Sequence, residues 1–380
     1  MVLVNYFYNI FFKFDLINKF ILINITMTKT LVILESRSKI SKVQSYLGDD
    51  YIVKACNGHI RGLHEKELSI DIDNNFKPTY KITSDKKKTV QYLKESALKC
   101  DKILLACDFD REGESISWHL AEVLKIPKKQ RKRLIFNEIT EKALKHSLKN
   151  TKDLDMNMFY AQQARRLLDR IIGWTLCPIL WKHIQNSYEK GKTISGGRVQ
   201  SVVLRLIIDR ENEINNFDSN NSFKITAMFK KDSITLPCQL NKEIIDRDKT
   251  IAFLKKCKKS EFTISSVNSS ESKRKPTAPF ITSTLQQEAS NKFKMPPKLT
   301  MKVAQTLYEN GYITYMRTDS LTLSDEALKN IENYIIKHYG IDYLNLKQYS
   351  NKSDNCQEAH EAIRPTKINM SDISKDDSLT

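Results

Sequence analysis

The chain has 380 residues, enough for two or more domains and a sizeable core, which excludes a single small module. Its 62 Lys and Arg residues outnumber 45 Asp and Glu residues. The formal net charge of +17 makes a polyanion, such as nucleic acid or an acidic membrane, the first partner to consider. An AT-rich coding sequence would produce the same bulk charge, so motifs must decide the partner.

Cysteine usage and the N-terminal segment both bear on location. The seven cysteines are scattered, odd in number and without a C-x-x-C pair, which argues against bound zinc and disulfides and indicates an intracellular protein. Residues 1–27 are apolar but interrupted by Lys13, Asp15 and Lys19, so no run reaches the length of a membrane span. We expect an N-terminal extension there, either disordered or translated from an upstream start, with the protein proper starting near Met27.

The first part of the chain alternates between strand and helix patterns. Short apolar runs at residues 30–35, 51–56 and 102–107 predict buried strands, with a helical stretch ending near Leu47. Apolar residues have helical spacing over 114–125. Strands that alternate with helices imply a parallel, doubly wound α/β sheet of Rossmann-like form, in which chemistry gathers at the carboxyl ends of the strands.

The remainder of the chain reads as helices around a strand-rich region. Residues 158–175 and 197–213 have the pattern of basic helices, and residues 217–275 are mainly strand-like and end in a linker. A further helical segment over 282–309 is interrupted by two consecutive prolines.

Four carboxylates stand within seven residues directly after the third predicted strand: Asp108, Asp110, Glu112 and Glu114. Glu35 closes the first strand, so the fold could bring it to the same crevice. Carboxylates this close repel one another unless a cation intervenes, and Mg²⁺ prefers oxygen ligands. The pattern predicts a Mg²⁺ site, with helix capping by the acids as the alternative. Glu114 is the acid that we expect to face solvent.

Two stretches have features that suit nucleic acid. Residues 191–201, GKTISGGRVQS, hold three of the ten glycines and suggest backbone close to a phosphate near a helix start, with a plain flexible loop as the alternative. No P-loop is present, because Asn186 stands where its first glycine is required. The second stretch puts basic groups beside aromatic rings, an arrangement that suits single-stranded nucleic acid. The alternative interpretation is a surface Arg–Asp pair with tryptophans that belong to the core. Its residues are Arg165, Arg166, Asp169, Arg170, Trp174 and Trp181.

A candidate nucleophile lies near the end of the chain. In NGYITYMRTDS, residues 310–320, Tyr315 and Arg317 stand two apart and so lie on one side of an extended segment. A phenol could attack a phosphodiester if nearby cations offset its high pKa, and a guanidinium could hold the phosphate. The pattern alone is weak, because the chain has 15 tyrosines.

Taken together, these stretches resemble the type IA DNA topoisomerases, specifically the bacterial topoisomerase I branch, from about Thr28 to Thr366. The resemblance rests on nine ordered stretches: LVILES with Lys39, NGHIRGL, DFDREGESISWHL, FNEIT, AQQARRLLDR, SGGRVQSVVLRLI, APFITSTLQQEAS, LYENGYITYMRTDS and QEAHEAIRP.

The resemblance implies a domain order. After the extension at 1–27, it implies a Toprim domain at 28–155 with a short excursion near 63–78. A helical single-strand DNA-binding domain at 156–216 (the first part of domain IV) and a β-rich arch domain at 217–275 (the first part of domain II) would follow. Residues 276–380 would form the tyrosine-bearing domain, domain III, in incomplete form.

The resemblance also implies roles for individual residues. The catalytic residues would be Tyr315 as nucleophile, Arg317, Glu35 as proton donor, Lys39 and His360. The Mg²⁺ ligands would be Glu35, Asp108, Asp110 and Glu112. The DNA-binding residues would be His59, Arg165, Arg166, Asp169, Trp174, Trp181, Ser195, Gly196, Gly197, Arg198, Val199, Gln200 and Arg317.

The implied activity is ATP-independent relaxation of negatively supercoiled DNA. One strand is cut through a 5′-phosphotyrosine, another segment passes, and the ester is resealed with Mg²⁺. The partners would be DNA with single-stranded segments and no membrane, and the protein would be a cytoplasmic, DNA-associated monomer. The alternatives are an inactive or cleavage-only single-strand-binding fragment and a Toprim nuclease or primase.

Four features depart from the family pattern. Arg37 stands where proline is usual, Gly62 replaces an acid, and Trp174 replaces a frequent tyrosine. The chain stops at Thr380 inside the implied tyrosine-bearing domain, so we expect a fragment.

Overall fold

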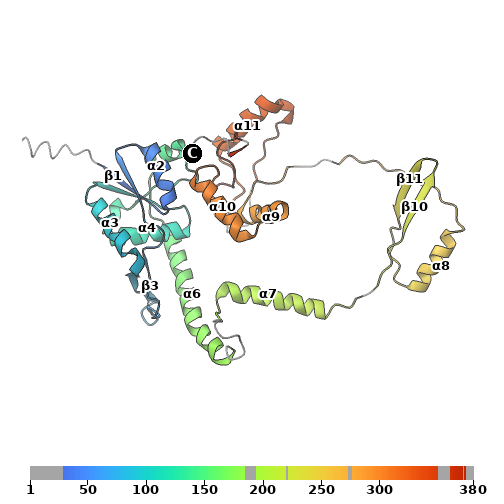
Figure 1. Ribbon diagram of the computed structural model, residues 1–380, viewed down its shortest axis with the longest axis horizontal. Coiled ribbons are helices and arrows are strands. Elements are labelled where there is room, and N and C mark those ends of the chain that lie inside the picture. Colours follow the sequence, from blue (N-terminus) through green and yellow to red (C-terminus); the bar gives the residue numbers. More distant parts are fainter. Residues whose placement is uncertain are drawn as a thin grey trace, which may run out of the picture. The chain divides into compact units, whose positions relative to one another are not determined.

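The computed structural model in Figure 1 describes residues 29–184, 194–219, 221–272, 276–349, 360–370 and 372–373. The predictions for residues 1–27 and for the Gly-Lys-Thr at 191–193 lie outside the described residues. The described chain forms two compact units. The first contains the residues up to Thr175 and those from Thr277 onward, and the second is Leu176–Pro276.

A five-stranded sheet forms the centre of the first unit. Its strands are β1 (Thr30–Leu34), β2 (Tyr51–Ala55), β7 (Lys102–Ala106), β8 (Lys132–Arg133) and β9 (Lys152–Asp153), in the order β2-β1-β7-β8-β9. The first four run parallel and β9 is antiparallel to β8. Leu34 lies opposite both Ala55 and Ala106, so the neighbouring strands β2, β1 and β7 end level. The predicted parallel sheet is confirmed.

Helices cover both faces of this sheet because residues along β1 alternate between two cores. Val32 and Leu34 pack with α2 (Ile40–Leu47) and α5 (Glu141–Lys149). Leu31 and Ile33 pack on the opposite face with α3 (Lys87–Ala97) and α4 (Arg111–Val123). A 3-10 turn at Arg37–Lys39 leads from β1 into α2. The alternation confirms the doubly wound arrangement.

Short antiparallel pairs and turns complete this part of the chain. Strand β3 (Arg61–Leu63) pairs with β6 (Tyr80–Ile82), and β4 (Ile70–Asp71) pairs with β5 (Lys77–Pro78). Two further 3-10 turns span Ser84–Lys86 and Lys128–Gln130.

Helix α6 (Met156–His183), drawn in green in Figure 1, continues well beyond its predicted end at residue 175. Pro178 lies inside the helix, although proline there lacks the backbone N–H of a regular turn. No helix in the described ranges combines the length and apolar character that a membrane crossing requires.

The second unit contains helix α7 (Arg198–Asn215), the hairpin of β10 (Thr226–Lys231) and β11 (Ile234–Gln239), and helix α8 (Arg247–Cys257). The strand-like prediction for 217–275 is correct for the hairpin but wrong for 247–257. The Asp246 side chain accepts a hydrogen bond from the Lys249 amide at 2.7 Å and thereby caps α8. An Asp before a helix was therefore the missed signal.

The last segment belongs to the first unit and contains α9 (Thr282–Phe293), α10 (Pro297–Glu309), α11 (Asp325–Tyr339) and a 3-10 turn at Ile341–Tyr343. The break predicted at the two prolines is confirmed, since α10 begins at Pro297. Ala304, Tyr308 and Tyr315 pack into the same core as Val32 and Leu34 of the sheet. The tyrosine-bearing segment is thus built onto one face of the sheet.

Gly113 in α4 is packed directly against the backbone of the acidic loop. A Cβ atom at this position would overlap the carbonyl oxygen of Asp108. Gly173 in α6, in contrast, has open space around its Cα atom. A side chain is therefore excluded by packing at Gly113 but not at Gly173.

We predict that Gly113→Ala lowers the free energy of unfolding by about 2 to 3 kcal/mol, because the loop must shift to relieve the overlap. The matched control Gly173→Ala should raise it by about 0.5 to 1 kcal/mol through helix propensity. Thermal unfolding followed by circular dichroism measures both. Equal effects of the two substitutions would contradict the close approach at Gly113.

Candidate active site

Asp110 joins the sheet edge to the tyrosine-bearing segment. It is the N-cap of α4, and its Oδ1 accepts a hydrogen bond from the Gly113 amide at 2.8 Å. Its Oδ2 accepts a hydrogen bond from the Tyr315 hydroxyl at 2.6 Å. The capping alternative is therefore correct for this one acid, and the cap aims the other carboxylate oxygen at the phenol.

Tyr315 is buried, with 3% of its surface exposed. Its backbone amide donates to the carbonyl of Asn137 at 2.8 Å. Burial, followed by the charges of Asp110 and Asp108, raises the pKa of the phenol, and Arg317 opposes that rise. In this arrangement Tyr315 is a neutral hydroxyl that donates to a carboxylate.

Arg317 lies beside the same carboxylate, with its Nη1 3.5 Å from Oδ2 of Asp110. About half of its side chain (52%) is exposed, so the guanidinium remains open to a second anion. The sequence placed Tyr315 and Arg317 on one side of a segment, and both in fact contact one oxygen of Asp110.

Lys39 neutralises the other loop aspartate. Its side chain is 1% exposed and its Nζ donates to Oδ1 of Asp108. Burial and the nearby charge of Asp108 raise the pKa of Glu35 to about 7, although Lys39 acts in the opposite direction. A fraction of Glu35 therefore carries a proton near neutral pH.

Glu112 has its own partners at the edge of the site. It contacts His59 Nε2 at 2.6 Å and accepts from Gln162 Nε2 at 3.2 Å. The hydrogen bond from His59 is the main cause that lowers the pKa of Glu112. Gln162 comes from α6, so Glu112 links the sheet to that helix.

His360 lies beside the candidate nucleophile. Its ring is 6.0 Å from the Tyr315 ring and 4.9 Å from Phe109. Burial lowers its pKa, and its buried Nδ1 has no hydrogen-bond partner among the described residues. A neutral imidazole therefore lies beside the Tyr315 ring.

Glu114 does not face solvent, and that expectation is wrong. It is 1% exposed, and its Oε2 accepts from Arg133 Nε at 3.0 Å while its Oε1 accepts from the Asp155 amide at 2.8 Å. Arg133 also donates to the carbonyls of Leu105 and Asp108 at 2.9 and 3.0 Å. The sequence showed an acid in a charged run, but only the β7–β8 pairing brings Arg133 under it.

The acids fit Mg²⁺ by their chemistry more than by their present arrangement. Within the described ranges, no three His, Cys, Asp or Glu side chains are grouped as a metal site. Glu35, Asp108 and Asp110 nevertheless offer oxygen donors whose mutual repulsion contributes to the raised pKa of Glu35. A bound cation would compete for carboxylate oxygens that now accept hydrogen bonds from Lys39 and Tyr315 or contact His59.

The basic residues of α6 lie on accessible surface. Arg165 and Asp169 are exposed and Arg166 is partly buried, with its Nη2 3.1 Å from where a Cβ of Gly62 would lie. Trp174 and Trp181 are each 44% exposed. The alternative with core tryptophans is therefore wrong, and two rings remain available for stacking.

The glycine-rich stretch before α7 packs against α6. Trp181 Nε1 donates to the Ile194 carbonyl at 2.7 Å, and a Cβ on Gly196 would lie 2.5 Å from Leu176. Gly197 is the N-cap of α7, while Val199 is 66% exposed. The remaining residues of the predicted set here, Ser195, Arg198 and Gln200, flank that cap. The close approach at Gly196 is thus to a leucine within the second unit.

Contacts between segments of the first unit that are far apart in the chain surround the site, and the sequence did not predict them. Residues 136–140 contact the segment 310–317 and Arg364, whose Nη2 lies 3.0 Å from Glu138. Gly311 is pressed against the carbonyl of Ile139, since a Cβ there would lie 2.5 Å from that oxygen. FNEIT and QEAHEAIRP were both noted as motifs, but only the fold brings them together.

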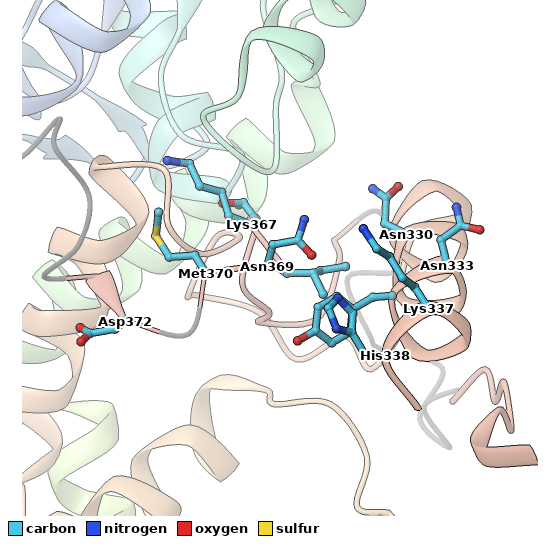
Figure 2. Close-up of a pocket in the computed structure, with 11 residues that line it drawn as sticks. Asn330, Asn333, Lys337, His338, Lys367, Asn369, Met370 and Asp372 are labelled. Atoms are coloured by element: carbon cyan, nitrogen blue, oxygen red, sulfur yellow. The ribbon is translucent and has the colours of Figure 1, made fainter. Parts of the chain in front are cut away.

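The pocket in Figure 2 shares no residue with the acids. It has a volume of about 750 Å³ and lies between α11 and residues 366–370 and 372. Lys337, His338 and Asn333 line it from the helix, opposite Asn369 and Met370. The candidate catalytic and metal-binding residues instead lie at the carboxyl edge of the sheet.

A doubly wound sheet that presents acids at this edge defines a Toprim-domain protein. The Toprim family model matches residues 30–139, and the model described as DNA topoisomerase matches residues 153–379. The chain belongs to the type IA DNA topoisomerase family.

Relatives agree with this assignment. The chain is 46% identical over 360 residues to a mimivirus protein described as DNA topoisomerase 1 type prokaryotic, covering 88% of this chain and 41% of that one. It is 42% identical over 361 residues to DNA topoisomerase 1 of Campylobacter jejuni, covering 90% and 51%. The full-length topoisomerase I structure from Thermotoga maritima matches with a TM-score of 0.74 and 36% identity, over 88% of this chain and 55% of that one. The chain thus spans about half the length of the relatives it matches.

We predict that Glu114→Gln lowers the free energy of unfolding by about 3 to 5 kcal/mol, because it leaves the buried charge of Arg133 without its partner. Glu141→Gln, in the exposed Glu141–Lys145 pair, is the matched control and should change it by less than about 0.5 kcal/mol. Thermal unfolding compares the two. A small effect of Glu114→Gln would contradict the structural role of the pair.

Proposed function

We propose that this chain carries out the ATP-independent type IA topoisomerase reaction, relaxing negatively supercoiled DNA by cutting one strand, passing another segment and resealing. The observation that supports this most directly is the Tyr315 hydroxyl on the carboxylate of Asp110, 2.6 Å away, with Arg317 beside it. Membership of the family gives the reaction class.

In the proposed cleavage step, the Tyr315 oxygen forms a bond to phosphorus and the bond from phosphorus to the 3′ oxygen breaks. The phenol loses its proton, for which Asp110 is the adjacent acceptor, and the 3′ oxygen gains one, for which Glu35 is the candidate donor. Arg317 would hold the phosphate, and Lys39 would assist at the 3′ oxygen. The phosphotyrosine keeps the ester bond energy, so resealing needs no ATP.

Glu35, Asp108, Asp110 and Glu112 are the residues that we propose for Mg²⁺. Toprim domains of topoisomerases are associated with this ion. When bound, it would supply positive charge beside the phosphate. His360 would support the phosphate through its neutral ring.

The proposed contacts with the single strand on α6 lie on the exposed surface of that helix. Arg165 and Arg166 would contact the phosphates of the strand, Asp169 would line the path beside them, and Trp174 and Trp181 would stack on bases. His59 and the residues Ser195, Gly196, Gly197, Arg198, Val199 and Gln200 complete the proposed path. We further propose a monomer that acts on DNA in the cytoplasm.

Two other functions make different predictions. A Toprim nuclease or primase would cut or synthesise without a covalent protein adduct. An inactive or cleavage-only single-strand-binding fragment would bind in a salt-sensitive manner without completing the cycle. The hydrogen bond between Tyr315 and Asp110 favours the topoisomerase reaction over a Toprim nuclease or primase, because neither of these needs a phenol there.

We predict that denaturant added during reaction with labelled single-stranded DNA traps a covalent complex, and that Tyr315→Phe abolishes it because the nucleophilic oxygen is gone. Electrophoresis of the labelled complex measures the yield. Tyr339→Phe, at a tyrosine that is 61% exposed, is the control and should trap as the unsubstituted chain does. Equal trapping by Tyr315→Phe would mean that the nucleophile is another group.

We predict that Asp108→Asn with Asp110→Asn leaves cleavage partly intact but impairs Mg²⁺-dependent resealing, because two proposed oxygen ligands lose their charge. Resealing is measured as loss of covalent complex after Mg²⁺ and salt are added. Asp71→Asn with Asp85→Asn makes the same charge change on exposed surface and serves as control. Resealing at the control rate would count against these ligands.

A further inference from the structure

A second tyrosine shares the buried side of the candidate site. Tyr308, on α10, is 1% exposed, and its ring centroid lies 5.1 Å from that of Tyr315 in an edge-to-face contact of 67°. The Nζ of Lys39 lies 4.7 Å from the same ring centroid. The ring therefore contacts both Tyr315, the proposed nucleophile, and Lys39, which is proposed to assist at the 3′ oxygen.

The hydroxyl of Tyr308 is buried and has no hydrogen-bond partner among the described residues. Leaving such a group unpaired costs about 1 to 3 kcal/mol, so a buried orphan donor calls for a reason. If Tyr308 served only to fill the core, phenylalanine would pack equally well there and would leave no buried hydroxyl unpaired.

The surroundings of this hydroxyl indicate where an acceptor would come from. Its pKa is raised well above the ordinary value, first by burial and then by the charges of Asp108, Glu35, Asp110 and Glu309. Three of these acids are the ones that face the proposed cleavage point, and none accepts its hydrogen bond. Together with the ring contacts to Tyr315 and Lys39, these acids indicate that the unpaired hydroxyl lies next to the residues proposed to hold a DNA phosphodiester.

We propose that Tyr308 is a further catalytic residue, whose ring aligns Tyr315 and Lys39 and whose hydroxyl donates a hydrogen bond to an oxygen of the bound phosphodiester. This inference rests on the proposed function, because the acceptor is the strand that Tyr315 attacks. No bond to Tyr308 forms or breaks, so it is not a second nucleophile. The donor is unpaired only while the strand is absent, which accounts for the orphan hydroxyl.

The test is Tyr308→Phe, which keeps the ring and removes only the hydroxyl. We expect an unchanged or higher unfolding temperature, unchanged affinity for labelled single-stranded DNA, and a single-turnover rate of covalent complex formation lowered about tenfold, the equivalent of one lost hydrogen bond. Tyr312→Phe removes a phenol oxygen from a nearby buried tyrosine, 6% exposed, and should keep the original rate. Tyr308→Leu removes the ring as well and should slow the reaction further.

Two results would overturn the inference. If Tyr308→Phe forms the covalent complex at the original rate, the hydroxyl has no role in cleavage. If the rate and the unfolding temperature fall together, the substitution has only disturbed packing. Adduct formation by the unsubstituted chain is measured in the same experiment. If that adduct is absent the proposed function fails, whereas its presence with an unaffected Tyr308→Phe rejects only the role of Tyr308.

Discussion

The arrangement of the site depends on one carboxylate with two tasks. Asp110 caps α4 through one oxygen and accepts the Tyr315 hydroxyl through the other. A capping aspartate has little freedom to rotate, so the direction of its second oxygen is set by the start of the helix. Because Gly113 leaves no room between that helix and the loop, the position of the phenol follows from backbone packing some two hundred residues away in the chain.

Charge pairing explains how a dense group of acids survives at this edge. Asp108 has Lys39, Asp110 has Arg317 and Glu114 has Arg133, while Glu112 has a hydrogen bond with His59. Glu35 lies among them, and burial together with the charge of Asp108 raises its pKa to about 7 against the opposing charge of Lys39. The acids thus divide into one, Glu114, that is paired deep in the core, and a set whose partners would exchange for a phosphate or a cation in the proposed reaction.

The hydrophobic core makes the sheet and the tyrosine-bearing segment one unit. Val32 and Leu34 on one face of β1 pack in the same cluster as Tyr308 and Tyr315. Tyr315 is only 3% exposed, and its amide is held by the Asn137 carbonyl within residues 136–140, so the proposed attack on a DNA strand needs a rearrangement that exposes the phenol. The proposed reaction therefore requires a change at the contacts that also hold the nucleophile in place, such as the ion pair of Glu138 and Arg364.

By itself, the sequence determined the parallel sheet and the helix break at the prolines, because periodicity and local motifs carry that information. The acids and Tyr315 were predicted from local motifs and the family resemblance, and their roles stay predictions. The sequence could not determine which acid is structural, since Glu114 becomes buried only when β8 brings Arg133 beneath it. Nor could it single out Tyr308 among 15 tyrosines. Partners, burial and pKa values arise from contacts between residues far apart in the chain, so only the tertiary structure decided them.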